Sequence, residues 1–130
     1  MSLDVTLYDS KETTEPCTCS QCGNAHTHTY REELYSSNIT HNLGAMAEEA
    51  GIYKHLWRPD ELNIFEAGQL VYALQTGLAL MLVDPKRFRK HDAANGWGTY
   101  DSFIPFVREY LAACEKYPNA IVSVCRWWGT

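Results

Sequence analysis

The sequence predicts an α+β domain in which a small antiparallel sheet is packed by about three helices. Apolar residues alternate near the N-terminus, recur at helical spacing through the middle of the chain, and alternate again near the C-terminus. We therefore expect an N-terminal hairpin to be joined in one sheet by a C-terminal strand. Helices should cover one face of that sheet, and residues 1–130 should form a single domain.

The hairpin is predicted from residues 3–8, where every second residue is apolar, and from residues 28–35, which should form its second strand. Residues 16–28 between them are expected to be a zinc-knuckle-like insertion at the tip of the hairpin. Residues 120–127 alternate enough to predict the C-terminal strand. The sheet should therefore contain these three strands.

The first two helices are predicted from apolar spacing and from residues that favour helix ends. Asn38 or Thr40 is a candidate N-cap for the first helix, and Gly51 can adopt the left-handed conformation that ends it. The second helix is expected to be the longest and to carry a broad apolar stripe. Asn63, with Glu66 three residues later, resembles a capping box at its start.

The third helix is predicted after a polar, glycine-containing loop over Lys90–Thr99. Asp84 and Pro85 should end the second helix before this loop and start one short further turn. Ser102 is the candidate N-cap of the third helix. Pro105 would then lie in its first turn, where a missing N–H costs little.

Composition and charge exclude several classes of protein. The chain is 45% apolar and 21% charged, which is typical of a globular domain. A formal net charge of −5 argues against binding to a nucleic-acid backbone, because such binding needs clustered Lys and Arg. No apolar run approaches the ~18 residues of a membrane span, and the N-terminus lacks the pattern of a signal peptide. We therefore expect the protein in a cytoplasm.

A cluster of cysteines and histidines predicts a structural zinc site. Cys17, Cys19 and Cys22 with His26 would supply four ligands, and His28 is an alternate fourth ligand. Four protein ligands close the coordination sphere, and a reducing cytoplasm favours metal over disulfides. The alternatives are an unmetallated thiol loop and an iron–sulfur cluster, for which a fourth nearby cysteine is missing.

Two further cysteines lie far from this cluster in the sequence. Cys114 and Cys125 each have apolar neighbours. We expect both to be buried as small hydrophobic side chains.

Four short blocks occur in a distinctive order: Asn-Ile-Thr-His-Asn at 38–42, Ala-Gly-Ile-Tyr at 50–53, Leu-Trp-Arg-Pro at 56–59, and Asn-Gly-Trp-Gly-Thr-Tyr at 95–100. Together they resemble a widespread family of small uncharacterised proteins encoded by bacteriophages and prophages. The resemblance implies a viral or prophage origin and brings no established activity. By analogy, small phage proteins often act against host defences, in some cases by sequestering a nucleotide signal.

Three of these blocks supply a candidate site for a small, nucleotide-like ligand. Asn42 should lie at the boundary of the core, where its amide must find a partner or contact a ligand. The glycines around Trp97 allow close backbone approach, and Trp57 with Arg58 offers an indole and a guanidinium for a planar anion. The candidate ligand-binding residues are Asn38, His41, Asn42, Trp57, Arg58, Asn95, Trp97 and Tyr100.

Each of these residues also has an ordinary structural interpretation. Asn38 could be only a helix cap, Trp97 and Tyr100 could fill the core, and Arg58 could pair with Asp60. The site hypothesis therefore depends on the three segments converging around one cavity.

The leading functional hypothesis is a non-enzymatic phage accessory protein that binds this ligand and acts as an anti-defence factor. A protein-interaction module that inhibits a host protein is the alternative, suggested by the acidic balance and by Trp127 and Trp128, and a homo-oligomer is compatible with both. A nucleotide-acting enzyme that uses His41 with Asp92 or Glu48 comes last. No phosphate loop, nucleophile elbow or metalloprotease histidine pair occurs, so no catalytic residue is assigned.

Overall fold

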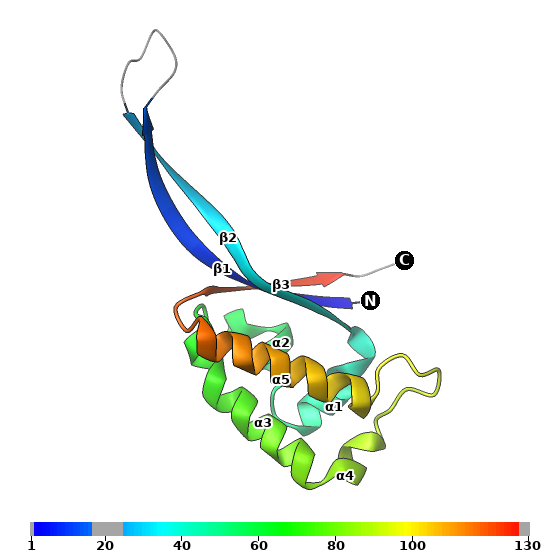
Figure 1. Cartoon of the computed structure of the whole chain (residues 1–130). Helices are drawn as coiled ribbons and strands as arrows, with labels where there is room; N and C mark the ends of the chain where they lie inside the picture. Colours follow the sequence, from blue (N-terminus) through cyan, green and yellow to red (C-terminus); the bar gives the residue numbers. More distant parts are fainter. Residues whose placement is uncertain (1, 17–24, 128–130) are drawn as a thin grey trace.

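The computed structural model describes residues 2–16 and 25–127, without the side chains of residues 10–31 and 127. A layer of helices lies against one face of an antiparallel sheet, which has three strands in this part of the chain (Figure 1). The strands are β1 (Ser2–Pro16), β2 (Ala25–Thr40) and β3 (Ile121–Trp127), in the spatial order β2-β1-β3. The predicted α+β class and three-stranded sheet are confirmed.

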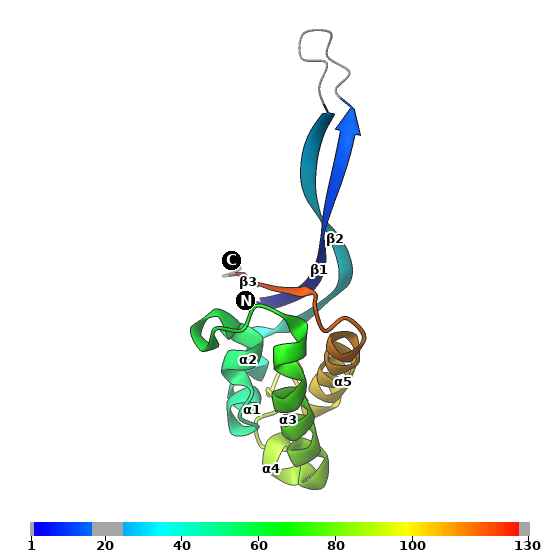
Figure 2. The ribbon, with the colours of Figure 1, turned by 90° about the vertical axis from the view of Figure 1, so that its left-hand side faces the viewer.

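The helical layer is formed by the chain between β2 and β3. Its segments are η1 (His41–Leu43), α1 (Gly44–Glu49), α2 (Tyr53–Trp57), η2 (Pro59–Leu62), η3 (Ala67–Leu70), α3 (Val71–Val83), α4 (Pro85–Arg89) and α5 (Tyr100–Lys116). Figure 2 shows α3 in front of α1 and α5, below the sheet. The short turn expected after Asp84 is α4.

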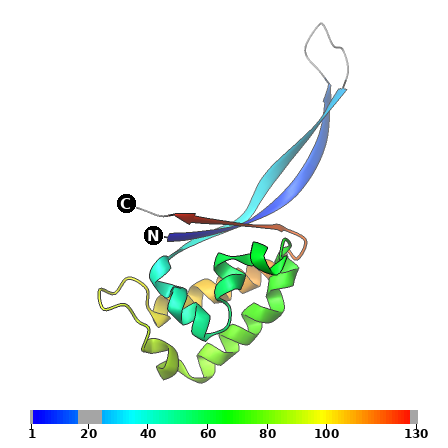
Figure 3. The ribbon, with the colours of Figure 1, turned by 180° about the vertical axis from the view of Figure 1, so that it is seen from behind.

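The hairpin is longer than predicted and extends beyond the helices as a two-stranded ribbon (Figure 3). The pairing of β1 with β3 ends at Tyr8 and Ile121, whereas its pairing with β2 continues to Pro16 and Ala25. Burial explains only the shorter part, where the apolar side chains of β1 are fully buried against the helices. The polar residues of the ribbon give no such alternating signal, so a pattern-based prediction stops short.

Of the two predicted N-caps of the first helical segment, Thr40 is confirmed, because β2 ends at Thr40 and η1 begins at His41. Ile39 pairs with Leu3 of β1, and this pairing holds the chain extended as far as Thr40. Thr40 is the N-cap of η1, and its hydroxyl accepts a hydrogen bond from the Asn42 N–H at 3.5 Å. The alternative of Asn38 as the cap is wrong.

The end of α1 has the predicted form. Gly51 has a φ of +77° and donates its N–H to the Glu48 carbonyl at 3.0 Å. The next residue, Ile52, donates its N–H to the Ala47 carbonyl at 2.9 Å. These two bonds define the Schellman ending of a helix, and Ile52 is buried beside it.

Two predicted helix starts are shifted by three residues. Glu66, rather than Asn63, is the N-cap of η3, with Gln69 completing a capping box, while Asn63 adopts a left-handed conformation at the end of η2. Thr99, rather than Ser102, is the N-cap of α5, and Ser102 completes that capping box. Pro105 therefore lies inside α5, beyond the first turn in which it was expected.

The core joins the inner face of the sheet to the helices. Its largest fully buried side chains include Trp57, Phe88, Phe103 and Tyr110. The apolar stripe predicted for the second helix consists of Ala67, Leu70, Val71, Leu74, Leu78, Met81 and Leu82, and all but Val71 and Leu82 are buried. However, α5 rather than α3 is the longest helix. In the part of the chain that the structure describes, no helix is long and apolar enough to cross a membrane.

The two isolated cysteines have different environments. Cys114 in α5 is buried as predicted, whereas Cys125 in β3 is exposed. Val122 and Val124 pack against the core, so the strand directs Cys125 to the opposite, polar face of the sheet. The prediction that both cysteines are buried is therefore wrong for Cys125.

Candidate functional site

A pocket of about 300 Å³ lies where β2 ends and the loop before α5 crosses it. Two of the three predicted segments, residues 38–42 and 95–98, meet at this pocket. The lining residues are Ser2, Asn38, Thr40, His41, Asn42 and Trp97. Four of the eight predicted ligand-binding residues therefore share one cavity.

Hydrogen bonds hold the loop against the end of β2. The amide of Asn42 donates to the Trp97 carbonyl at 2.9 Å, and the Asn95 side chain accepts from the Trp97 N–H at 3.0 Å. Asn95 thus shapes the turn without lining the pocket. The backbone of Trp97 is fixed while its side chain is 72% exposed, so the indole offers an open aromatic surface.

Close packing at Gly98 explains why the loop contains a glycine there. Gly98 has a φ of +103°, and an added Cβ would lie 3.0 Å from both the Asn42 Cβ and the Thr40 Cγ2. A side chain at this position would push the loop away from the turn that carries Asn42. Gly96 also has a positive φ, of +77°, but an added Cβ there would meet nothing within 4 Å.

His41 is oriented by the core beneath the pocket. Its Nδ1 accepts a hydrogen bond from Trp57 Nε1 at 3.2 Å, and the two rings are nearly perpendicular, at 84°. For a neutral imidazole, this bond assigns the ring proton to Nε2. Trp57 is only 1% exposed and stacks on Tyr53 at 5.2 Å, so it positions His41 rather than facing a ligand.

Two other predicted ligand residues do not line the pocket. Arg58 donates to Glu61 at 3.2 Å, and its hydrogen bonds with Tyr53 and Glu61 raise its pKa above the ordinary value. Tyr100 is buried and donates its hydroxyl to the Met81 carbonyl at 2.9 Å. The expectation that all three segments enclose one cavity is therefore wrong for the Trp57–Arg58 segment.

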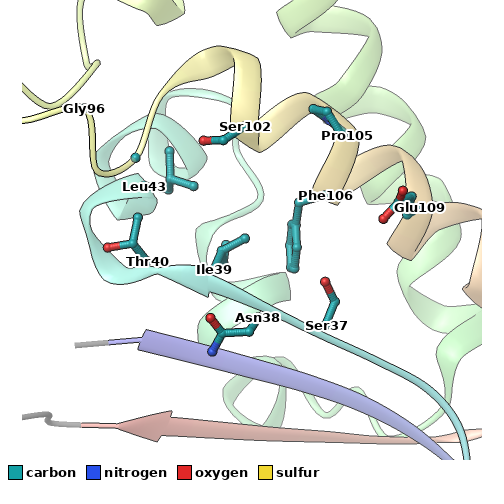
Figure 4. Close-up of a pocket in the computed structure, with 11 residues that line it drawn as sticks. Ser37, Asn38, Ile39, Thr40, Leu43, Gly96, Ser102, Pro105, Phe106 and Glu109 are labelled. Atoms are coloured by element: carbon teal, nitrogen blue, oxygen red, sulfur yellow. The ribbon is translucent and has the colours of Figure 1, made fainter.

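A second cavity, of about 430 Å³, lies between β2 and α5 and was not predicted (Figure 4). It shares Asn38 and Thr40 with the first pocket. Its helix side is formed by Ser102, Pro105, Phe106 and Glu109. Their spacing of three and four residues marks one face of α5, but the sequence does not show that β2 lies opposite this face.

The predicted metal ligands are not tested by the described residues. Cys17, Cys19 and Cys22 lie outside them, and His26 and His28 belong to the part of β2 whose side chains are not described. Among the side chains that are described, no group of three His, Cys, Asp or Glu residues is placed to hold a metal ion.

One carboxylate suggested as a partner of His41 has a structural role. Asp92 accepts a hydrogen bond from the Tyr100 N–H at 2.7 Å and so anchors the first turn of α5. Glu48, the other suggested partner, is exposed on α1. The pocket is therefore bounded by capped, hydrogen-bonded turns.

Comparisons of the chain with family models, curated proteins and solved structures found no match. Function therefore has to be inferred from the geometry and chemistry of the pocket itself.

Proposed function

We propose that this protein is a non-enzymatic binding protein for a small ligand with a planar, polar ring, such as a nucleobase. The observation that carries the proposal is the exposed Trp97 indole beside the side chains of Asn38, His41 and Asn42 in one pocket. An aromatic face with nearby amide groups is the combination by which proteins stack a base and contact its polar edge.

The energetics of such a contact fit an exposed indole. Stacking of a base on an aromatic side chain contributes about 1–3 kcal/mol. The amide of Asn42 is held by the Trp97 carbonyl, so both groups are already positioned before a ligand arrives. Preorganisation of this kind reduces the entropy lost on binding.

The charge of the pocket favours a neutral ring over a phosphate. No Lys or Arg lines the pocket, because Arg58 lies elsewhere and pairs with Glu61. The chain also has a formal net charge of −5. Any phosphate of a nucleotide ligand is therefore proposed to extend into solvent, and the ring supplies the affinity.

The proposal is tested by measuring ligand binding with titration calorimetry and thermal-shift assays. The ligands are four nucleosides, their 5′-monophosphates and cyclic dinucleotides. Ligands that bind only the folded protein raise its melting temperature. We expect at least one panel member to bind, with Trp97→Ala weakening it at least tenfold and leaving the melting temperature of the unliganded protein unchanged.

The control variant is Tyr72→Ala, because Tyr72 is an 80% exposed aromatic on α3 that does not line the pocket. It should bind the same ligand as tightly as the native chain. Absence of binding across the whole panel, or equal binding by Trp97→Ala, would contradict the proposal.

The biological role we propose is that of a phage accessory factor acting in the host cytoplasm. Two of the four blocks that carry the resemblance, residues 38–42 and 95–100, build the pocket. An anti-defence factor of this type would remove a nucleotide-derived signal from solution. Tighter binding of a cyclic dinucleotide than of the corresponding nucleoside would support this role, and the reverse order would oppose it.

We also propose that a structural zinc ion closes the hairpin tip. The ladder pairs Glu15 with His26 and Pro16 with Ala25, so the backbone of the predicted ligand His26 lies at the last paired positions of the hairpin. Cys17, Cys19, Cys22 and His26, with His28 as the alternate, supply the soft thiolate and imidazole ligands that zinc prefers. About one equivalent of zinc by elemental analysis is expected, and a metal-free protein would contradict it.

A further inference from the structure

We propose that the open edge of β2 binds an extended segment of a partner protein that carries a basic residue. The segment adds a fourth strand beside β2, and every second side chain of this strand enters the cavity between β2 and α5. This site lies beside the small-ligand pocket and is independent of the function proposed for it.

One hydrogen bond at the edge of β3 fixes the directions in which the backbone groups of all three strands point. Val122 of β3 donates its N–H outside the sheet, to the Phe65 carbonyl at 2.9 Å. Its partner in the ladder is Leu7 of β1. In an antiparallel pair, the backbone N–H and C=O groups of two directly opposed residues either both point towards each other or both point away. The backbone groups of Leu7 therefore point away from β3 and bond to Tyr35 of β2.

The alternation of the backbone then leaves the next positions of β2 facing outward. Tyr35, Ser37 and Ile39 bond to β1, so the N–H and C=O groups of Ser36 and Asn38 point away from the sheet. No described strand lies beyond β2 in the order β2-β1-β3. An exposed edge of this kind is a template for an added strand.

The cavity beside this edge provides side-chain contacts for an added strand (Figure 4). Phe106 and Leu43 are buried apolar residues that form its base, and Pro105 lies beside them on α5. Gly96 and Gly98 bound one end. Since every second side chain of an extended peptide points to the same face, two or three of them would enter this cavity.

Acidic groups define the charge of the partner. Glu109 lines the cavity from α5, and Glu33 is exposed further along β2. Burial raises the pKa of Tyr35 in β2, and the Glu109 carboxylate adds to this rise. No Lys or Arg lines the cavity. A basic side chain on the added strand would compensate this charge.

The same charges oppose a second copy of this chain as the occupant. Pairing of two β2 edges across this cavity would bring together two copies of Glu109, and no Lys or Arg lines the cavity to compensate them. Like charges that face each other across paired strands are destabilising. A different protein with a basic, extended segment fits the edge better.

The test uses a fluorescein-labelled peptide, Ser-Val-Thr-Arg-Thr-Val-Ser, capped at both ends, with the full native chain. Its Val, Arg and Val side chains share one face. Fluorescence anisotropy compares it with a peptide carrying Glu in place of Arg, and with one N-methylated at both threonines. The N-methyl groups remove strand-pairing donors without changing the side chains.

We expect the basic peptide to bind at least tenfold more tightly than either comparison peptide. Glu109→Gln should reduce the preference for Arg over Glu at least fivefold, whereas Glu115→Gln, on the exposed part of α5 away from the cavity, should preserve it. Trp97→Ala should bind the peptide normally, which separates this site from the small-ligand pocket.

Several results would overturn the proposal. Equal binding of the N-methylated peptide would exclude strand addition, and no binding of the basic peptide at millimolar concentration would exclude the site. If Glu109→Gln and Glu115→Gln reduced the preference for the Arg peptide over the Glu peptide equally, the preference would reflect general charge attraction and not a contact in the cavity. A solution dimer that is lost in Ser36→Pro would show that a second copy occupies the edge instead.

Discussion

Trp57 and Trp97 are hydrogen-bonded to two consecutive residues, His41 and Asn42, yet the Trp57 indole belongs to the core and the Trp97 indole faces solvent. Trp57 is 1% exposed and donates its Nε1–H to His41. Trp97 is 72% exposed, and only its backbone is held, by Asn42 and by its own loop. Both residues lie in glycine- or proline-flanked blocks that look equally suited to a ligand.

The difference shows that the local sequence of an indole does not set its role. Trp57 lies in α2, where its ring stacks on Tyr53 of the same helix and contacts the ring of His41 in η1. Trp97 lies at a turn whose backbone is held by Asn95 within the loop and by Asn42 of η1, while its side chain points out of the core. One tryptophan thus supports the pocket from below, and the other forms its aromatic wall.

The largest expected effect is on stability, from Trp57→Ala. Removing a buried indole leaves a cavity and leaves His41 without its donor, so the free energy of unfolding should fall by about 3–5 kcal/mol. Trp97→Ala should change it by no more than about 0.5 kcal/mol. Urea denaturation measures both variants, and equal losses would remove the distinction between the two indoles.

Alanine at the two loop glycines should give a smaller difference. Gly98→Ala introduces a Cβ at 3.0 Å from two side chains in a left-handed conformation, whereas Gly96→Ala meets only the conformational strain. Strain alone costs roughly 1–2 kcal/mol, so Gly98→Ala should lose more stability than Gly96→Ala and should also weaken ligand binding. Denaturation and calorimetry on both variants check this order.

Acid should weaken the contact between α1 and α4, away from both indoles. Hydrogen bonds from Arg87, Lys90 and His91 lower the pKa of Glu49 to about 2. A lowered pKa contributes stability above the ordinary value near 4.5, and this contribution is lost as the pH falls from there towards 2. In Glu49→Gln, stability should therefore depend less on pH over this range, as measured by urea denaturation at each pH. An identical pH dependence would contradict the assignment.

The smallest expected effect is a difference in chemical reactivity among the cysteines. Burial raises the pKa of Cys114 to about 12, so it should resist iodoacetamide, whereas the exposed Cys125 should react. If zinc is bound, Cys17, Cys19 and Cys22 should react only after chelation. Peptide mapping by mass spectrometry reads each site separately, and rapid labelling of Cys114 in the native protein would contradict its burial.

Helix ends illustrate how far local sequence can be trusted. Gly51 was identified as a helix end because a positive φ is a property of one residue and its immediate neighbours. The N-caps at Glu66 and Thr99 were missed, since Asn63 and Ser102 were equally good local candidates. Tertiary contacts determine which candidate is the N-cap. For example, the Ala67 N–H donates to the Ala120 carbonyl at 2.9 Å, next to the N-cap Glu66.

The residues of the candidate site, like the helix ends, could be predicted from the sequence only in part. Asn38, His41, Asn42 and Trp97 were placed together correctly, because their blocks combine polar, aromatic and glycine residues near turns. Trp57, Arg58 and Tyr100 carry similar chemistry, but the structure engages them in the core or in local pairs. No sequence pattern predicts the cavity beside α5, because its β2 and α5 lining residues are more than sixty positions apart even at the closest pair, Thr40 and Ser102.

The sequence by itself determined the α+β class, the inner face of β1, the end of α1 and the apolar faces of α3 and α5. These features depend on periodicity and backbone preference, which are local properties of the chain. Only the tertiary structure decided which indole is buried, which cysteine is exposed, and which edge of the sheet stays open. Those outcomes depend on what each segment packs against, and the same local pattern is compatible with more than one neighbour.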